Sequence, residues 1–225
     1  MKLWRYVIRN NDGSAPNYDP RFITLAICKP RIRKGARPGD LVLAFAGREI
    51  APDPHRVVWA GVVHEKLTFE QYWADVRFQG KKPHATDVPD NIYEPGPLGL
   101  RQVRNPIHNE GNVVRDCSGV FVLVMEPSWR LIPEASSLPE QFEHLRMLPG
   151  NRRGHRKDDL SCADADELVA WLKSRSRPPR ATVDVDAKSS CRASQSPCGP
   201  DRASDGARQL KPGFDGPVTR GRSGC

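Results

Sequence analysis

The stretch RPGDLVLAFA, residues 37–46, decides the fold. Pro38 fixes φ and Gly39 supplies a permissive backbone, so residues 37–40 are predicted to form a tight turn. Residues 41–46 are apolar at every position, which is typical of a strand buried on both faces. The next β-branched run, residues 56–64, is predicted to pair with it in the antiparallel direction. These two strands form the predicted centre of a sheet.

Three further segments extend this sheet. Residues 2–9 alternate apolar and basic side chains, residues 22–28 form a second extended run, and residues 120–125 (VFVLVM) form a strong final strand that is expected to stop at Glu126-Pro127. Taken in chain order, these strands predict a β-meander.

Helical signals flank the sheet. Thr68, followed three residues later by Gln71, forms a capping box that predicts a short helix over residues 68–75. Two more helices are predicted over residues 139–147 and 164–173, the second capped by Asp164. The predicted class is therefore α+β: a curved, mostly antiparallel sheet or small barrel with peripheral helices. Residues 79–119 lack clear periodicity, and long irregular segments in compact domains are more often functional than idle.

The chain divides by composition into a domain at 1–175 and a tail at 176–225. All five tryptophans and all four tyrosines precede residue 176, and Phe214 is the only aromatic residue after it. The tail is rich in Ser, Arg, Gly and Pro without an apolar period, so it is predicted to be disordered and basic. It holds nine Lys plus Arg against five Asp plus Glu, which is half of the net charge of +8. The net charge favours an anionic partner. The domain itself is only mildly basic, however, and such domains are common among proteins that bind no nucleic acid.

Several classes of protein are disfavoured. Residues 1–13 lack the apolar segment of a signal peptide, and no apolar run approaches the ~20 residues that span a bilayer, so no membrane association and a cytoplasmic location are expected. The six cysteines are scattered without CxxC pairing, which favours reduced thiols and predicts no metal site. Nothing in the sequence calls for a cofactor. The oligomeric state is left open.

Two basic clusters are candidate anion sites. Lys29, Arg31 and Arg33 alternate, so on an extended segment they share one face and can follow phosphates. A charged sheet edge that blocks strand pairing explains them equally well. The second cluster, residues 150–156 (GNRRGHR), contains Arg153 just before Gly154 and His155 just after it, and it suits a phosphate or an oxyanion. His155 is either a donor or acid-base group there, or a bystander in a basic loop. A third basic group, residues 77–82, is interpreted as a solvated loop.

A base-binding pocket also needs an aromatic surface and a polar edge. Tyr93 follows Asp90 and Asn91 in a polar loop and is the first choice for stacking, with Trp59 or Trp4 next. Most of the remaining aromatic side chains must be core.

Common enzyme motifs are missing, including phosphate-binding loops, the GxSxG elbow and zinc-hydrolase signatures. Asp40, Asp90 and His155 remain catalytic candidates, and whether the chain is an enzyme stays open. A wider set of polar residues has no spacing that predicts convergence: Glu94, Glu110, Asp116, His64, His108 and Cys117.

The motifs taken together resemble a known family. CKPRIR at 28–33 with Gly39-Asp40, EKLTFEQYW at 65–73, DNIY at 90–93 and RGHR at 153–156 are similar in order to the second class of nucleotide modification associated domains over about residues 1–160. This resemblance implies a bacterial or phage protein linked to DNA base modification. It also implies that site residues lie at these motif positions: Lys29, Arg31, Arg33, Asp40, Asn91, Tyr93 and His155. Val88-Pro89 departs from the expected pattern, and a weaker likeness in strand order points to PUA-like, EVE and ASCH folds.

The preferred function is recognition of a modified base or nucleotide, in DNA or free. Lys29, Arg31 and Arg33 would bind phosphates, while Tyr93 stacks on the base and Asn91 reads its edge. One alternative is a small enzyme acting on a nucleotide or DNA base. A second is a protein-protein adaptor that binds other proteins of a modification or defence operon.

Overall fold

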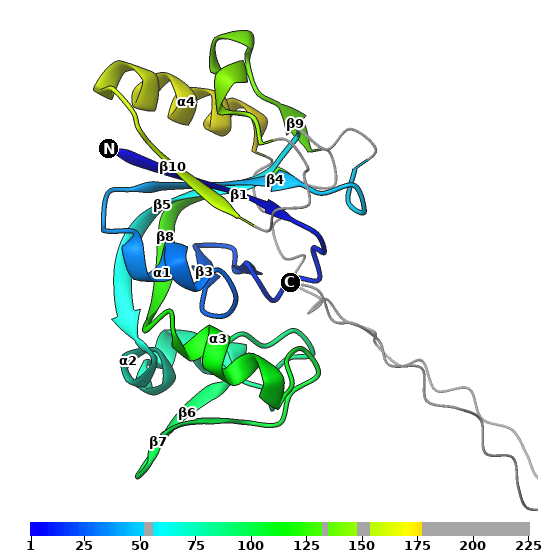
Figure 1. Cartoon of the computed structure of the whole chain (residues 1–225), viewed down its shortest axis with the longest axis vertical. Helices are drawn as coiled ribbons and strands as arrows, with labels where there is room; N and C mark the ends of the chain where they lie inside the picture. Colours follow the sequence, from blue (N-terminus) through cyan, green and yellow to red (C-terminus); the bar gives the residue numbers. More distant parts are fainter. Residues whose placement is uncertain (52–55, 132–134, 148–153, 177–225) are drawn as a thin grey trace, which may run out of the picture. The chain divides into compact units, whose positions relative to one another are not determined.

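The computed structural model describes residues 1–51, 56–131, 135–147 and 154–176. Figure 1 shows these residues in colour along the chain. Except for Ser176, the predicted tail lies outside the described residues, so its predicted disorder is not addressed by the structure. No helix within the described ranges is both long enough and apolar enough to span a bilayer.

The fold is α+β and is built on one mostly antiparallel sheet, as predicted. Its strands follow the order β10-β1-β4-β5-β8-β3-β2, and β9 pairs with β5. Because this path ends at β10 and β2, the sheet is open rather than a closed barrel within the described residues. A separate hairpin consists of β6 (Tyr93–Gly96) and β7 (Gly99–Gln102). The strands of the main sheet are β1 (Lys2–Ile8), β2 (Asn17–Tyr18), β3 (Ile23–Leu25), β4 (Leu41–Ala46), β5 (Arg56–Thr68), β8 (Phe121–Arg130), β9 (Ser136–Ser137) and β10 (His155–Asp159).

Strand β4 is buried on both faces, which confirms the interpretation of its apolar run. Leu41, Leu43 and Phe45 contact one hydrophobic cluster, whereas the alternate residues Val42 and Ala44 contact another. The alternation follows from the period of two in a strand, which sends successive side chains to opposite faces. The predicted antiparallel pairing of β4 with β5 is also confirmed.

The predicted meander is wrong in two places. Strand β1 pairs with β4 in the parallel direction, and β8 lies between β5 and β3. The side chain of Asp40, just before β4, fixes the parallel pair at its start because it accepts hydrogen bonds from the backbone N–H of Lys2 at 3.2 Å and from the Trp4 indole at 3.1 Å.

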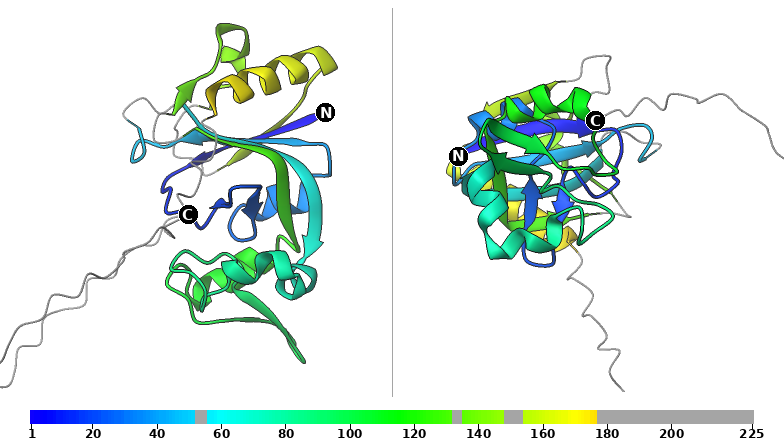
Figure 2. Two further views of the ribbon diagram at one scale, coloured as in Figure 1. Left: turned by 180° about the vertical axis from the view of Figure 1, so that it is seen from behind. Right: turned by 90° about the horizontal axis from the view of Figure 1, so that it is seen from below.

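Strand β8 also runs beyond its predicted end at Glu126-Pro127 and stops at Arg130. The pairing register with β5 shifts at this point, since Gly61 pairs with Ser128 but Val63 pairs with Met125. Proline cannot donate a ladder hydrogen bond, and a local irregularity in the register accommodates it. Figure 2 shows β5 and β8 curving together away from the rest of the sheet.

Helices cover the sheet on both sides (Figures 1 and 2). Helix α4 (Cys162–Arg175) and the 3-10 segment η3 (Glu140–Leu145) pack on one face through Leu168, Leu172 and Phe142. The cap of α4 is Ser161 rather than the predicted Asp164, because the Ser161 hydroxyl accepts the Asp164 N–H at 3.0 Å. The second predicted helix is thus confirmed with a start that lies two residues earlier, and the first is a shorter 3-10 turn.

The other side carries the remaining short helices. Helix α1 (Pro30–Gly35) packs on the second face of the sheet through Ile32. At the far end of β5 and β8 lie α2 (Phe69–Ala74), η1 (Val76–Lys81), η2 (Glu110–Asn112) and α3 (Val113–Cys117). The capping box of α2 is confirmed, with both of its reciprocal hydrogen bonds present. Residues 79–119 are therefore less irregular than predicted.

Candidate functional site

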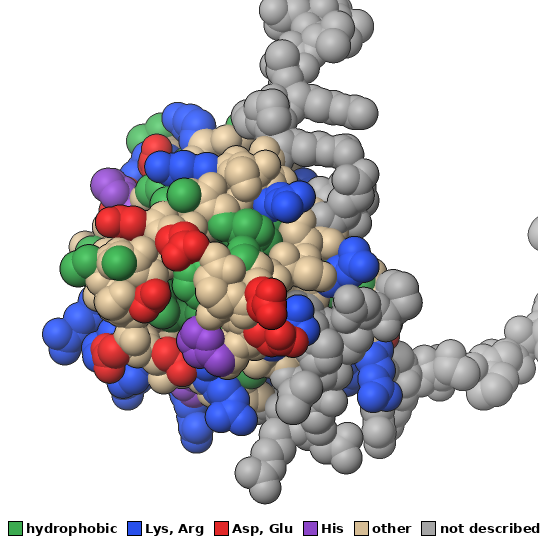
Figure 3. All heavy atoms as spheres, turned by 90° about the horizontal axis from the view of Figure 1, so that it is seen from above, with side chains coloured by type: hydrophobic (Ala, Val, Ile, Leu, Met, Phe, Trp, Pro, Cys, Tyr) green, Lys and Arg blue, Asp and Glu red, His purple; other side chains and the backbone are tan. Residues whose placement is uncertain are grey.

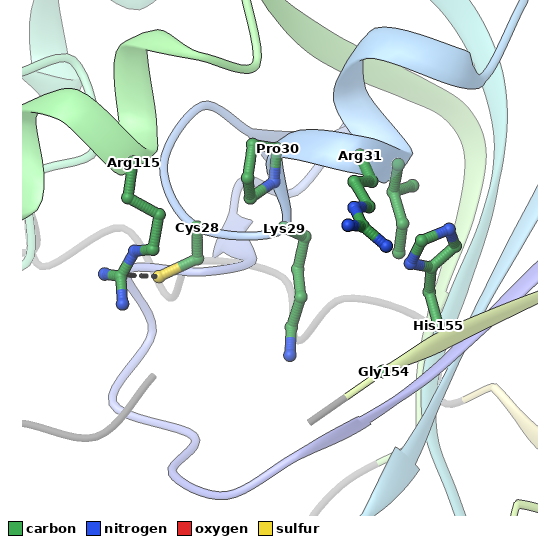
Figure 4. A pocket seen from close by; sticks show the side chains of 8 residues that line it. Cys28, Lys29, Pro30, Arg31, Arg115, Gly154 and His155 are labelled. Carbon is green, nitrogen blue, oxygen red and sulfur yellow. Dashed lines mark hydrogen bonds between the residues drawn. The ribbon is translucent and has the colours of Figure 1, made fainter. Parts of the chain in front are cut away.

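A pocket of about 410 Å³ opens between α1, α3 and the start of β10. Figure 4 shows the residues that form its walls. Cys28 and Lys29 come from the loop before α1, and Arg115 comes from α3. Arg31 and His155 lie close together on the side opposite Arg115. The pocket thus brings together distant segments of the sequence, since Cys28 and Arg115 lie 87 positions apart.

Residues 30–35 form helix α1 and Lys29 is its N-cap residue, which overturns the prediction of an extended basic row. Pro30 stands at the start of α1, where its missing N–H costs nothing and its fixed φ suits a helix. Two positions along a helix correspond to about 200° of rotation, so Arg31 and Arg33 face nearly opposite directions. Arg31 is exposed and lines the pocket, whereas Arg33 is completely buried.

Arg33 is a structural residue and does not line the pocket. Its guanidinium donates to three backbone carbonyls, those of Cys28 at 2.8 Å, Phe121 at 2.7 Å and Asp116. It packs so closely on Gly119 that an added Cβ there would lie 2.5 Å from the guanidinium carbon. Burial lowers the pKa of Arg33 to about 10, which leaves it charged at neutral pH. Its satisfied donors explain why it does not serve as the predicted phosphate ligand.

Below the basic wall lies a buried chain of polar groups. Cys28 Sγ is 3.5 Å from His108 Nε2, and His108 Nδ1 is 2.5 Å from Asp116 Oδ2. The other carboxylate oxygen of Asp116 accepts the backbone N–H of Cys28 at 2.9 Å. All three residues are at most 4% exposed, and Cys28 alone of them lines the pocket. The chain therefore places a thiol, an imidazole and a carboxylate in sequence, with the thiol at the pocket.

The electrostatics of this chain favour a charged carboxylate. Burial by itself raises the pKa of Asp116, but the hydrogen bond and the charge of His108, together with the Cys28 N–H, outweigh it and lower that pKa below its ordinary value. Tyr93 adds a further donor, since its hydroxyl bonds Asp116 Oδ2 at 2.9 Å. When His108 is neutral, an ionised Asp116 holds its proton on Nδ1, and Nε2 then faces the thiol as an acceptor.

The same three residues are also the one group among the described residues whose ligand atoms lie close enough to hold a metal ion, all within 4.8 Å of one another. Their geometry favours hydrogen bonding instead. His108 Nδ1 and Asp116 Oδ2 are 2.5 Å apart. Two ligand atoms that each lie about 2.0–2.1 Å from one tetrahedral ion are farther apart than this. The carboxylate oxygens of Asp116 are moreover already engaged as acceptors.

Cationic groups form the rim of the pocket. Lys29 Nζ lies 4.5 Å from the centre of the Tyr6 ring and donates to the Val7 carbonyl at 3.3 Å. On the opposite wall, Arg115 Nη2 is 4.0 Å from Cys28 Sγ and 2.8 Å from Asn112 Oδ1. None of the described residues that line this pocket is acidic. The rim is thus a region of positive charge around the thiol.

His155 completes the rim on β10. Its ring stacks on Trp4 with the centroids 5.7 Å apart. Partial burial, followed by the charges of Arg31 and Lys29, lowers the pKa of His155 below the ordinary 6.5. His155 is therefore neutral at neutral pH and acquires a positive charge only in more acidic solution.

The predicted site residues fall into two groups. Lys29, Arg31 and His155 meet at the pocket. Arg153 lies outside the described residues. Asp40 is bound into the turn before β4, where it also accepts the Arg37 N–H at 3.0 Å. It does not line the pocket, because its carboxylate joins that turn to β1.

The DNIY motif is buried and structural. Asp90 accepts hydrogen bonds from the hydroxyls of Thr24 and Tyr72, both at 2.7 Å, and Asn91 donates to the carbonyls of Tyr72 and Phe78. Tyr93 is 1% exposed and packs against Phe69. Its ring cannot stack on a base, so that predicted role does not carry over. Trp59 is also fully buried, and Trp4 lies behind His155.

The basic residues at 77–82 differ in their exposure to solvent. Lys81 and Lys82 are only 6% and 7% exposed, and Lys81 bonds the side chain of Asn17. Arg77 is more exposed and pairs with Glu65 and Asp75. The prediction of solvent exposure is thus confirmed only for Arg77, and the segment forms the 3-10 helix η1 rather than a loop.

Sequence reasoning missed Cys28 and Arg115 and had no reason to join His108 to Asp116. One signal was available. Cys28 follows an extended run and precedes Pro30 by two positions, so the chain reads strand, cysteine, helix start, which is a known setting for an exposed nucleophile.

Comparisons with known proteins give one match. The model of the family described as nucleotide modification associated domain 2 matches residues 1–187. No curated protein and no solved structure matches the chain.

Proposed function

Because this chain belongs to the nucleotide modification associated domain 2 family, we propose that the pocket beside Cys28 binds a phosphate group of a nucleotide or nucleic acid. One observation carries the proposal: Lys29, Arg31, Arg115 and His155 surround a pocket with no acidic residue among its described lining. Cations gathered around a concave surface attract phosphates. A surface on which charges of both signs alternate attracts them much less.

The distribution of charge elsewhere supports this choice of surface. On the face covered by α4, acidic and basic side chains are interspersed (Figure 3). Helix α4 itself exposes Asp166 and Glu167 as well as Lys173 and Arg175. Such a mixed face offers little attraction to a polyanion, whereas the described lining of the pocket includes basic side chains and no acidic one.

The size and lining of the pocket define what it would recognise. A volume of about 410 Å³ lies within the usual ~300–1,000 Å³ of small-ligand sites and suits one nucleotide unit. The lining offers guanidinium, ammonium and imidazole groups, while the nearby rings of Trp4 and Tyr6 are buried. We therefore expect phosphate contacts to supply most of the affinity, and a modified base to be distinguished by fit rather than by stacking.

Replacing Arg31 tests the proposal most directly, because Arg31 is exposed and its removal leaves the core intact. Arg31→Ala should weaken binding of a fluorescent single-stranded oligonucleotide by about tenfold and reduce the slope of log K against log salt by about one. Arg101→Ala is the matched control, since Arg101 is exposed on the β6–β7 hairpin away from the pocket. Equal losses in the two variants, measured by anisotropy, would contradict the proposed site.

His155 predicts a pH dependence for the same binding. Its pKa lies below 6.5, so its imidazole gains charge only as the pH falls below that value. Affinity for the oligonucleotide, whose diester phosphates stay ionised, should rise over this range in the wild type. In His155→Gln the rise should disappear, since glutamine does not titrate.

A further inference from the structure

We propose that the pocket is also a catalytic site, in which Cys28 attacks the carbonyl carbon of an acyl donor with His108 as general base and Asp116 as its orienting partner. The location of the donor rests on the proposed function, because the cationic rim would hold a phosphate-bearing ester or amide over the thiol. The assignment of Cys28 as nucleophile depends instead on the geometry of the groups beneath the rim.

The three groups stand in the order that nucleophilic catalysis requires. A base must reach the nucleophile, and a third group must hold the base in the correct tautomer. His108 Nε2 lies 3.5 Å from Cys28 Sγ, and Asp116 holds the opposite ring nitrogen at 2.5 Å. Asp116 also accepts the Cys28 N–H, so it positions both ends of the chain of groups.

The backbone at Cys28 is held in a strained conformation. Cys28 and Lys29 have φ of 56° and 41°, in the left-handed region that L-residues rarely adopt. Such strain persists only where the surrounding structure imposes it, and it is concentrated at functional sites. Here the carbonyl of Cys28 is held by Arg33 and its N–H by Asp116. The side chain that this turn supports is the thiol at the pocket.

Positive charge lies where the reaction would develop negative charge. Arg115 Nη2 is 4.0 Å from Cys28 Sγ, and Figure 4 shows its guanidinium directed at the sulfur. A guanidinium at that position favours the thiolate over the thiol and can also stabilise the oxygen of a tetrahedral intermediate.

The reaction balances without a further reactant in its first half. The thiol proton passes to His108 Nε2, the Sγ–C bond forms, and the carbonyl π electrons move to the oxygen. When that oxygen re-forms the carbonyl, the bond to the leaving group breaks and the leaving group takes the proton from His108. The product is a thioester on Cys28. Water or an amine then attacks the thioester, His108 accepts its proton, and the proton returns to the sulfur as the acyl group departs.

The remaining described cysteines provide internal controls. Cys117 is partly buried, and burial raises the pKa of its thiol, which makes it a poor nucleophile. Cys162 is exposed at the start of α4. A thiol that reacts only because it is accessible would resemble Cys162, whereas a thiol activated by its neighbours would react although it is almost fully covered, as Cys28 is.

The experiment uses p-nitrophenyl acetate as the acyl donor. The full-length wild type should release a burst of p-nitrophenolate equal to the enzyme concentration, and peptide mass spectrometry should find acetyl on Cys28. Cys28→Ser should abolish the burst, while Cys162→Ser should leave it intact. Asp116→Asn and His108→Gln should slow acetylation of Cys28 by about 100-fold or more. Thermal melts identify variants that fail to fold. If Asp116→Asn or His108→Gln does not fold, Tyr93→Phe replaces it. Tyr93→Phe removes only one donor to Asp116, and we expect it to lower the acetylation rate a few-fold.

Three results would overturn the inference. They are acetylation mainly at Cys117 or Cys162, an unchanged rate in a folded Asp116→Asn, and binding of one equivalent of Zn²⁺ that requires Cys28, His108 and Asp116 together. Oligonucleotide binding by Cys28→Ser separates this inference from the proposed function. If the wild type binds the oligonucleotide but is not acetylated, the phosphate site stands and the nucleophile is contradicted. If it is acetylated but does not bind the oligonucleotide, the nucleophile stands and the phosphate site is contradicted.

Discussion

Two buried aspartates, one bonded to β3 and the other to the loop that follows it, have similar partners and opposite electrostatics. Asp90 and Asp116 are each at most 1% exposed, and each accepts a hydrogen bond from a tyrosine hydroxyl, Tyr72 or Tyr93. Burial raises the pKa of Asp90, although the charge of Lys81 opposes this effect. The pKa of Asp116 is lowered, because His108 touches it and outweighs the same burial.

The contrast lies in the distance from each carboxylate to the basic side chain beside it. Lys81 directs its ammonium to Asn17 and makes no ion pair with Asp90 among the described residues, whereas His108 bonds Asp116 at 2.5 Å. A buried carboxylate stays ionised only when a charge or several donors meet it directly. Asp90 is therefore a structural group of the core, and Asp116 is a candidate participant in chemistry.

The largest expected effect concerns the cations near the two aspartates. Arg33→Met should lower the free energy of unfolding by about 3–5 kcal/mol, because it removes all three hydrogen bonds that the buried guanidinium donates to the carbonyls of Cys28, Phe121 and Asp116. Lys81→Met should cost about 1–3 kcal/mol, since it removes mainly one bond to Asn17. Chemical denaturation measures both. A smaller loss for Arg33→Met than for Lys81→Met would show that Arg33 is not the main tie beneath the pocket.

The pH dependence of stability should separate the aspartates by sign. Asp90 has a raised pKa in the folded state, so its contribution is fully present below the ordinary value of 3.8 and is lost as the pH rises through the folded pKa. Asp116 has a lowered pKa, so its contribution is present above 3.8 and is lost as the pH falls through the folded pKa.

Between about pH 4 and pH 8, the destabilisation caused by Asp90→Asn should therefore shrink with rising pH. The destabilisation caused by Asp116→Asn should instead shrink as the pH falls below 3.8, where the contribution of the ionised carboxylate is lost. Urea titrations of wild type and both variants at several pH values give these differences directly. Parallel slopes for the two variants would mean that the aspartates share one electrostatic environment.

The smallest effect compares the two tyrosine hydroxyls. Tyr93→Phe and Tyr72→Phe each remove a hydrogen bond to a buried carboxylate, and each should cost about 1–2 kcal/mol of stability. Only Tyr93→Phe should also slow acetylation of Cys28, because the Tyr72 hydroxyl bonds Thr24 and Asp90, whereas the Tyr93 hydroxyl bonds Asp116. A slower reaction in both variants would point to a general loosening of the core.

Local patterns in the sequence predicted the centre of the fold well. The apolar run of β4, the β-branched run of β5 and the capping box of α2 each depend on neighbouring residues, and all three are confirmed. The parallel pairing of β1 was missed because it depends on the side chain of Asp40 reaching across the sheet. Helix α1 was missed because alternating basic residues fit an extended edge as well as a short helix.

The site was predictable only for its charges. Lys29, Arg31 and His155 were identified from basic clusters, and the pocket does gather them. The pair of Cys28 with His108 spans 80 residues and that of Cys28 with Asp116 spans 88, so no spacing rule applies to them. Tyr93 was predicted to stack on a base. Instead, its hydroxyl donates to Asp116 within the core.

The bonds of Arg33 have a practical consequence for transplanting this pocket. Its guanidinium holds two carbonyls whose residues lie 88 positions apart, those of Cys28 and Asp116. Grafting the cysteine loop onto another scaffold would therefore fail unless α1, α3 and Gly119 travelled with it as one cassette. Extra residues inserted at the tip of the β6–β7 hairpin, by contrast, would leave that cassette undisturbed, and this tip is the natural attachment point for a reporter group.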